Sequence, residues 1–206
     1  MSGSSYEREL RSILGGDRGA ILASTKTTTA QQRAAYLLCA SKPFLVIRGA
    51  GSLGVDLVAL RGDFSFPIEV KSSRKARLHF SSNPRLTEQY TDFVAQCERS
   101  GVVPLYAYRI KGIRGDSWRI FAPELEFVEG MGKLMYDRLP KVSSTRSGNL
   151  VLVWDEGMPL STFLEHVNGS GSRAIGALFA DDLDEQDRDD RPSRSLTLPP
   201  VRPRVG

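Results

Sequence analysis

The chain has 206 residues, is 40% hydrophobic and carries a formal net charge of +4 at pH 7. This length and composition suit one globular domain, or one domain with a tail. No apolar run approaches the ~20 residues of a membrane-spanning helix, and the N-terminal MSGSSYERELRS lacks the apolar core of a signal peptide. We therefore expect a soluble intracellular protein without membrane contact.

The first part of the chain predicts two helices and then three closely spaced strands. Apolar residues at helical spacing mark 5–14, and a Gly/Ser/Thr-rich stretch separates this helix from a second one at 29–40. Strand-like runs follow at 44–48, 55–60 and 66–72. Their connections are too short for crossover helices, so we expect an antiparallel meander.

The following part predicts a βαβ unit. Residues 84–99 form a well-marked amphipathic helix, with Asn83 as its N-cap and Pro84 in its first turn. A strand at 102–110 follows and is expected to lie parallel to the strand at 66–72. Two further strands and a closing helix are expected at 118–121, 150–154 and 160–167. The order of elements predicts an α/β fold with a mixed central β-sheet flanked by helices.

The composition changes at the C-terminal end of this domain. NGSGS is typical of a flexible linker, and the segment after it is charged, Pro-rich and poor in large apolar residues. We predict a domain over residues 1–167 and a largely disordered tail over 168–206. The tail holds six Arg and seven Asp or Glu, which leaves the domain with a balance of +5. A basic domain is compatible with a polyanionic partner.

Two acids and a lysine fall on neighbouring predicted strands. Asp56 lies in the run VDLVAL, and Glu69 and Lys71 lie two apart in FPIEVKSS, so they share one strand face. If the strands pair, Asp56 lies beside Glu69. The two carboxylates and the backbone carbonyl of Val70 then offer the hard oxygen ligands that suit Mg²⁺, for which Mn²⁺ is an expected substitute. Such a cation would activate a water, and Lys71 would orient it or stabilise the transition state.

Two other interpretations of this region were weighed. IEVKS also suits a solvent-facing strand of alternating charge, but the order of acid, hairpin and Glu-x-Lys favours a nuclease site. Gly49, Gly51 and Gly54 match the spacing of a dinucleotide-binding fingerprint. That fingerprint requires a helix at its third glycine, and the short strand-like segment before Phe66 leaves no room for one.

The pattern resembles the PD-(D/E)XK nuclease superfamily and, more narrowly, the archaeal Holliday junction resolvase family of the Hjc type. The resemblance is carried by ERELRSIL, VIRGAGS, VDLVAL, IEVKSS and DSWRIFAPE, and it spans most of residues 5–167. It implies a restriction-endonuclease-like nuclease fold. It also implies that Asp56 and Glu69 are the metal-binding and catalytic acids, and that Lys71 is the catalytic lysine.

The resemblance assigns further residues near the N-terminus. Glu7 and Arg8 match a Glu-Arg pair that lies at the family's active site, where Glu7 would complete the metal and catalytic set. Glu9 is the competing acid, and we prefer Glu7 because it lies beside the buried stripe of its helix. An inserted segment near 15–42 separates this helix from VIRGAGS.

The resemblance also implies contacts with DNA. Arg48 and Ser52 match an Arg and a Ser of the family's strand and following loop; Ser52 would touch the scissile phosphate or a metal-bound water, or is an ordinary loop hydroxyl. Arg8 and Arg48 are expected to bind phosphates, whose oxygens a guanidinium matches in pairs. Three basic residues after the catalytic strand predict a patch that follows the DNA backbone, or else a solvated loop: Arg74, Lys75 and Arg77.

The leading hypothesis is a Mg²⁺-dependent endonuclease that resolves four-way DNA junctions in recombination and repair. It would act in the cytoplasm, on the nucleoid. Paired symmetric nicks require two sites, so we expect a homodimer. The alternatives are another nuclease of the superfamily, of restriction or repair type, and an inactive DNA-binding module. The tail is a weaker candidate for binding a sliding clamp or a recombination protein, because it lacks a clear clamp-binding signature.

Overall fold

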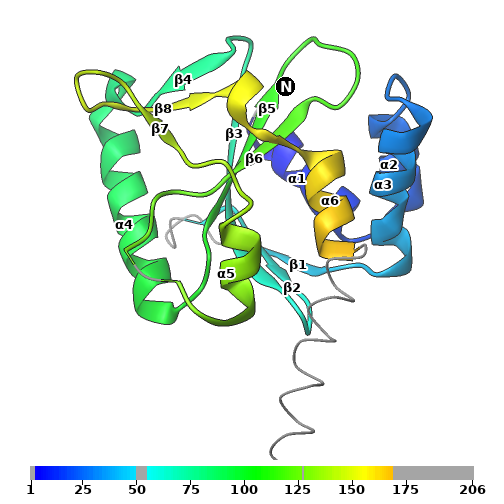
Figure 1. Cartoon of the computed structure of the whole chain (residues 1–206). Coiled ribbons are helices and arrows are strands. Elements are labelled where there is room, and N and C mark those ends of the chain that lie inside the picture. Colours follow the sequence, from blue (N-terminus) through cyan, green and yellow to red (C-terminus); the bar gives the residue numbers. More distant parts are fainter. Residues whose placement is uncertain (1–2, 50–54, 127, 169–206) are drawn as a thin grey trace, which may run out of the picture. The chain divides into compact units, whose positions relative to one another are not determined.

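The computed structural model describes residues 3–49, 55–126 and 128–168 (Figure 1). The chain divides into two units, Met1–Ser172 and Arg173–Gly206, and the second lies outside the described residues. The predicted disorder of the tail therefore stays a prediction. No helix in the described ranges is long and apolar enough to cross a membrane.

A six-stranded mixed sheet forms the centre of the described unit, in the order β1-β2-β3-β5-β6-β9. Its strands are β1 (Leu45–Arg48), β2 (Leu57–Leu60), β3 (Ser65–Ser73), β5 (Leu105–Ile110), β6 (Trp118–Phe121) and β9 (Met158–Pro159). The first three form the expected antiparallel meander, and β3 pairs with β5 in parallel. The predicted α/β architecture with a mixed sheet is confirmed.

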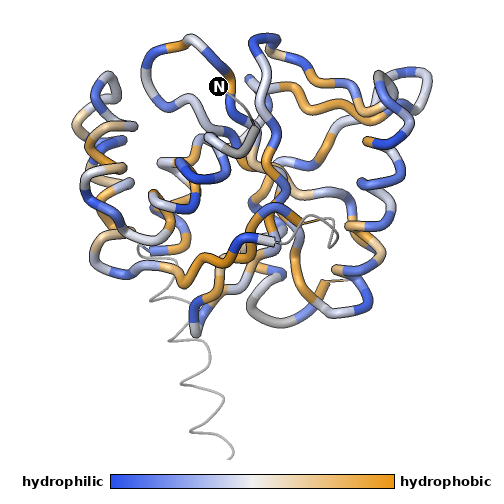
Figure 2. The backbone as a smooth tube through the Cα atoms, turned by 180° about the vertical axis from the view of Figure 1, so that it is seen from behind, coloured by the Kyte–Doolittle hydropathy of each residue, from blue (hydrophilic) through white to orange (hydrophobic). Residues whose placement is uncertain are grey.

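Helices cover both faces of the middle of this sheet, which explains why β3 is apolar along most of its first half. Helix α1 (Gly3–Leu14) packs on β3 and β1. Helix α4 (Pro84–Ser100) packs on the opposite face, where its Phe93 ring lies 5.7 Å from that of Tyr106. Strands buried on both faces need near-continuous apolar runs. Figure 2 shows hydrophobic stretches along the backbone of the sheet.

The sequence signals at the start of α4 act as expected. The Asn83 side chain accepts a 3.0 Å hydrogen bond from the backbone N–H of Arg85, and Pro84 occupies the first turn, where no intrahelical donor is needed. The helix then spans the gap between β3 and β5, which makes their parallel pairing possible.

The inserted segment forms two helices, α2 (Arg18–Ser24) and α3 (Ala30–Ser41). We expected only the second. The first begins at Asp17, whose side chain accepts a 2.9 Å bond from the N–H of Ala20. This helix has only seven residues and lies in a Gly/Ser/Thr-rich stretch, so it is too short to show a helical repeat of apolar residues. Helix α3 packs against the last described helix, α6 (Leu160–Asn168).

A second, three-stranded sheet has the order β4-β8-β7. Its strands are β4 (Arg77–His79), β8 (Leu150–Val153) and β7 (Ser143–Ser144). The sequence predicted β8 but missed β4, β7, the two-residue strand β9 of the central sheet and the helix α5 (Gly130–Tyr136). Strands of two or three residues carry no readable alternation, and glycines interrupt α5. Two 3-10 turns, Phe80–Ser82 and Trp154–Glu156, complete the described elements.

Candidate active site

Glu69 and Lys71 lie on β3 with their charged groups in contact. The Lys71 Nζ is 2.7 Å from Glu69 Oε1, and the two side chains are 13% and 11% exposed. In the parallel register Glu69 lies opposite Tyr106, and Lys71 lies opposite Tyr108. Residues in register point to the same side, so the pair shares the sheet face that α4 covers.

Asp56 lies at the point where β2 and β3 separate. The backbone pairing of these strands ends at Leu57 and Ile68, and beyond it the Val70 N–H donates a 2.8 Å bond to Asp56 Oδ2. We expected Asp56 inside the strand, but β2 begins one residue later because this side chain, and not the backbone, pairs with β3. The N–H and C=O of a strand residue face the same side. The Val70 carbonyl therefore opens toward Asp56.

The electrostatics of the two acids are those of a crowded carboxylate pair. Burial raises the pKa of Glu69, Lys71 opposes this, and the nearby charge of Asp56 adds to the increase. Burial also raises the pKa of Asp56; the Val70 hydrogen bond opposes it and the charge of Glu7 adds to it. A divalent cation would relieve both the burial and the repulsion.

The donor set fits Mg²⁺ through Asp56, Glu69 and the Val70 carbonyl, which are all oxygen ligands. Within the described ranges, no group of three or more His, Cys, Asp or Glu side chains is close enough to hold a metal ion. Glu7 instead accepts a 2.7 Å bond from Arg48 Nη2. It lies near the acid pair, since its charge acts on the pKa of Asp56.

Glu9, the alternative to Glu7, faces another part of the sheet. Its carboxylate lies 3.0 Å from Arg109 Nε and accepts a 3.0 Å bond from Trp118 Nε1. These partners come from β5 and β6, whereas Arg48 ends β1. The geometry therefore brings Glu7, and not Glu9, toward Asp56.

Gly49 is a residue of the site that sequence reasoning missed. Its N–H donates a 2.9 Å bond to the carbonyl of Asp56, and a Cβ built on it would overlap the Val55 carbonyl. Only glycine permits this close approach of two backbones. The signal was present in GAGSLG, which the sequence analysis related to the dinucleotide fingerprint and to a family loop, without a role for Gly49. Gly49 follows β1, which pairs with β2 in an antiparallel hairpin. The strand–helix arrangement that a dinucleotide fingerprint needs is therefore absent from the described residues here. Ser52 lies outside the described residues.

The predicted DNA-binding residues lie on α1, at the end of β1 and in the segment that follows β3. Arg8 is exposed on α1, beside Glu7 in the chain. Arg74 and Lys75 are exposed in the turn after β3, and Arg77 begins β4 and is not part of a loop. The Tyr108 hydroxyl donates a 2.6 Å bond to the Lys75 carbonyl, which fixes this turn to the sheet.

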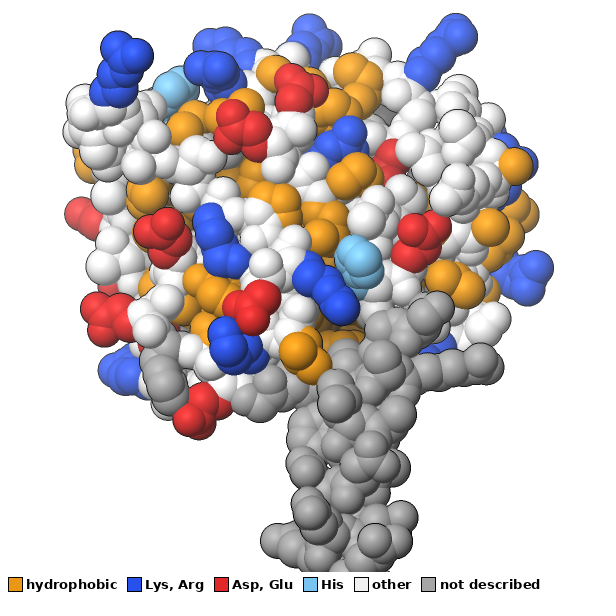
Figure 3. Space-filling model, in the orientation of Figure 1, with side chains coloured by type: hydrophobic (Ala, Val, Ile, Leu, Met, Phe, Trp, Pro, Cys, Tyr) orange, Lys and Arg blue, Asp and Glu red, His pale blue; other side chains and the backbone are white. Residues whose placement is uncertain are grey.

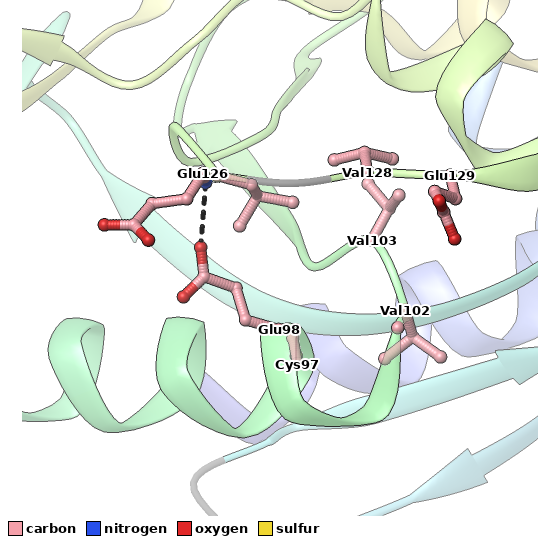
Figure 4. Close-up of a pocket in the computed structure, with 9 residues that line it drawn as sticks. Cys97, Glu98, Val102, Val103, Glu126, Val128 and Glu129 are labelled. Atoms are coloured by element: carbon pink, nitrogen blue, oxygen red, sulfur yellow. Dashed lines mark hydrogen bonds between the residues drawn. The ribbon is translucent and has the colours of Figure 1, made fainter.

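A cavity of about 280 Å³ lies at the far end of α4, away from these residues (Figure 4). Its lining includes Glu98, Glu126 and Glu129 beside Val102 and Val103. The Glu126 N–H donates a 3.0 Å bond to Glu98 Oε1, and the other side chains shown line the same hollow. Its acidic lining is unsuited to a phosphate backbone, so we do not assign it to the site.

Comparisons with known proteins identify the family of this chain. The family model described as archaeal Holliday junction resolvase (Hjc) matches residues 32–141, more than half of the chain. No curated protein matches this chain. The 1.6 Å structure of Archaeoglobus fulgidus Hjc, a Holliday junction resolvase from an archaeal hyperthermophile, is similar at 21% identity and a TM-score of 0.39, over 66% of this chain and 96% of that one. The matched range contains Arg48, Asp56, Glu69 and Lys71, and begins after α1. The chain belongs to the archaeal Holliday junction resolvase (Hjc) family, whose members are junction-resolving nucleases.

Proposed function

We propose that this chain hydrolyses phosphodiesters of four-way DNA junctions at Asp56, Glu69 and Lys71 with the help of Mg²⁺, which Mn²⁺ can replace. The observation that carries the proposal is the pair of carboxylates around Val70, Glu69 buried and Asp56 partly buried, with raised pKa values and a lysine ammonium 2.7 Å from Glu69. Buried acid pairs with perturbed pKa values are typical of functional sites.

Each residue has a distinct task in this proposal. When bound, Mg²⁺ supplies a water of lowered pKa and neutralises charge on the phosphate. The Val70 N–H holds the Asp56 carboxylate in place for the cation. Glu69 holds the Lys71 ammonium on the sheet face that carries both side chains. There the ammonium stabilises the negative charge that develops on the phosphate. Cleavage would leave a 5′-phosphate and a 3′-hydroxyl.

Glu7, Arg8 and Arg48 serve the DNA strand in this scheme. Glu7 orients the Arg48 guanidinium, which is positioned to bind phosphate oxygens in pairs. Arg8 and the basic residues after β3 add backbone contacts. Such contacts recognise shape and not base sequence, so affinity should fall steeply with salt.

Junction resolution requires two cuts related by symmetry, and a two-fold homodimer supplies two such sites. We infer that the protein acts as a homodimer on DNA in the cytoplasm. Light scattering of the full chain, with and without junction, tests the oligomeric state. A strict monomer in both conditions would contradict the dimer.

The first test is a cleavage assay in Mg²⁺ with a labelled four-way junction and a linear duplex of the same arms. Wild type is compared with Lys71→Ala and with Lys133→Ala, an exposed lysine paired to Asp137 on α5. Symmetric cuts in the junction alone, lost only in Lys71→Ala, support the proposal. Cutting of the linear duplex favours a restriction or repair nuclease, and junction binding without cleavage favours a binding module.

A further inference from the structure

The small β4-β8-β7 sheet is fixed to the end of the catalytic strand. The Tyr108 hydroxyl bonds the Lys75 carbonyl at 2.6 Å, and the Trp154 N–H bonds the Ala76 carbonyl at 2.7 Å. Strand β4 then pairs with β8 along its whole length, from Arg77 opposite Val153 to His79 opposite Val151. The position of this sheet is therefore fixed relative to the strand that carries Lys71.

The strands of this sheet, the turn between β7 and β8 and the turn that leads into β4 carry positive charge only. Neither residues 74–87 nor residues 138–154 contain an Asp or Glu. The exposed basic side chains of these two segments are Arg74, Lys75, Arg77, Arg85, Arg138 and Arg146. Figure 3 shows Lys and Arg side chains along the edge of the molecule at which Figure 1 labels β4. The first acids after β8 lie in the 3-10 turn Trp154–Glu156, where Glu156 accepts a 2.9 Å bond from the hydroxyl of Ser143, the first residue of β7.

Arg146 stands at the tip of the turn between β7 and β8. The turn is closed by 2.8 Å backbone bonds from Thr145 to Asn149 and from Gly148 to Thr145. The Thr145 and Ser147 hydroxyls lie 3.0 Å apart and bind the backbone and side-chain nitrogens of Asn149. These bonds fix the backbone from which the exposed Arg146 side chain projects, so less backbone entropy is lost when the turn binds a phosphate.

This turn continues the line of basic residues that leaves the catalytic strand. It joins β8 at Leu150, beside the His79 end of β4. A DNA backbone that follows β4 would therefore pass Arg77 first and reach Arg146 farther from the cut.

We infer that the β7–β8 turn, through Arg146, is a second phosphate-binding site that holds the DNA arm leaving the active site along β4. The turn lies outside the range that matches the family model, which ends at residue 141. The inference rests on the proposed function, because it takes junction DNA as the ligand. It adds a binding site that the catalytic residues do not require.

The test compares Arg146→Gln with Arg99→Gln. The second variant removes the same charge from the last turn of α4, the end of that helix farther along the chain from β4. Junction binding is measured from low to high salt, and bound phosphates are mapped by hydroxyl-radical footprinting. We expect Arg146→Gln to weaken binding about three- to tenfold and to reduce the slope of log K against log salt by about 1. Protection should be lost farther from the cut than the protection lost in Arg77→Gln.

Equal affinity, salt slope and footprint for Arg146→Gln and Arg99→Gln would overturn the inference while leaving the proposed function intact. Loss of protection next to the cut would also overturn it, since Arg146 would then act at the catalytic centre. A wild-type protein that neither binds nor cuts the junction would overturn both proposals.

Discussion

The backbone N–H of Phe44, just before β1, donates a 2.9 Å hydrogen bond to the carbonyl of Leu14, the last residue of α1. The two ends of the inserted segment thus meet at one place. Helix α1 passes to β1 as it would if the two helices between them were absent. This is why the insertion does not separate Glu7 on α1 from Arg48 on β1.

Gly16→Ala should destabilise the fold more than Gly112→Ala. Both glycines have positive φ, +78° and +82°, so either alanine costs about 1 kcal/mol in backbone strain. A Cβ at Gly16 would also meet the Cys39 carbonyl at 2.7 Å, whereas nothing lies within 4 Å at Gly112. We expect a further loss of about 1–2 kcal/mol at Gly16, measured by urea unfolding. Equal losses would show that the junction of the insert is not tightly packed.

Asp56→Asn should abolish cleavage and stabilise the metal-free protein at neutral pH. An asparagine oxygen can still accept the Val70 N–H, and the buried negative charge is removed. Burial raises the pKa of Asp56 in the folded state, so its charge lowers stability as pH rises through that pKa and has no effect below the ordinary carboxyl range. The stability gain of Asp56→Asn should therefore grow with pH in melting curves recorded in EDTA.

Asp63→Asn is the matched control for that prediction, with the opposite sign. Burial acts to raise the pKa of Asp63, but hydrogen bonds and charge from Arg61 and Lys42 outweigh it and lower that pKa. Its charge therefore stabilises the fold above the ordinary carboxyl range and loses this effect as pH falls. Asp63→Asn should lower the melting temperature at neutral pH. A loss of stability in Asp56→Asn as well would argue against a strained acid pair.

Mg²⁺ should raise the melting temperature of the wild type and not that of Glu69→Gln. A cation that binds only the folded state stabilises it by about 2.7 kcal/mol at a hundred times its Kd. Glu7→Gln should keep the shift, because the proposed donors are Asp56, Glu69 and the Val70 carbonyl. A shift lost in Glu7→Gln would instead make Glu7 a ligand.

Glu9→Gln should reduce stability more than cleavage, and Glu7→Gln should reduce cleavage more than stability. Glu9→Gln weakens a largely buried contact with Arg109 and should cost about 1–3 kcal/mol in urea unfolding while cleavage by the folded enzyme persists. Glu7→Gln removes a partner of the more exposed Arg48, so it should cost less than about 1 kcal/mol but reduce cleavage strongly. The reverse pattern would assign the active-site acid to Glu9.

Much of the fold could be predicted because its signals are local. The period of 2 in FPIEVKSS set Glu69 and Lys71 on one face, and Asn83 with Pro84 located the start of α4. The missed elements have short-range signals that are weak. Helix α2 and strand β4 are too brief for periodicity, and tertiary pairing with β8 stabilises β4.

The sequence by itself determined the antiparallel meander of the first three strands, the Glu-x-Lys spacing and the identity of the candidate acids, since these depend on neighbours within a few residues. Only the tertiary structure decided that Asp56 bonds the Val70 N–H outside the strand pairing, and that Glu7 rather than Glu9 faces the acid pair. Both depend on partners far apart in the chain. A helix presents several polar positions beside its buried stripe, and only the sheet beneath it selects which one reaches the site.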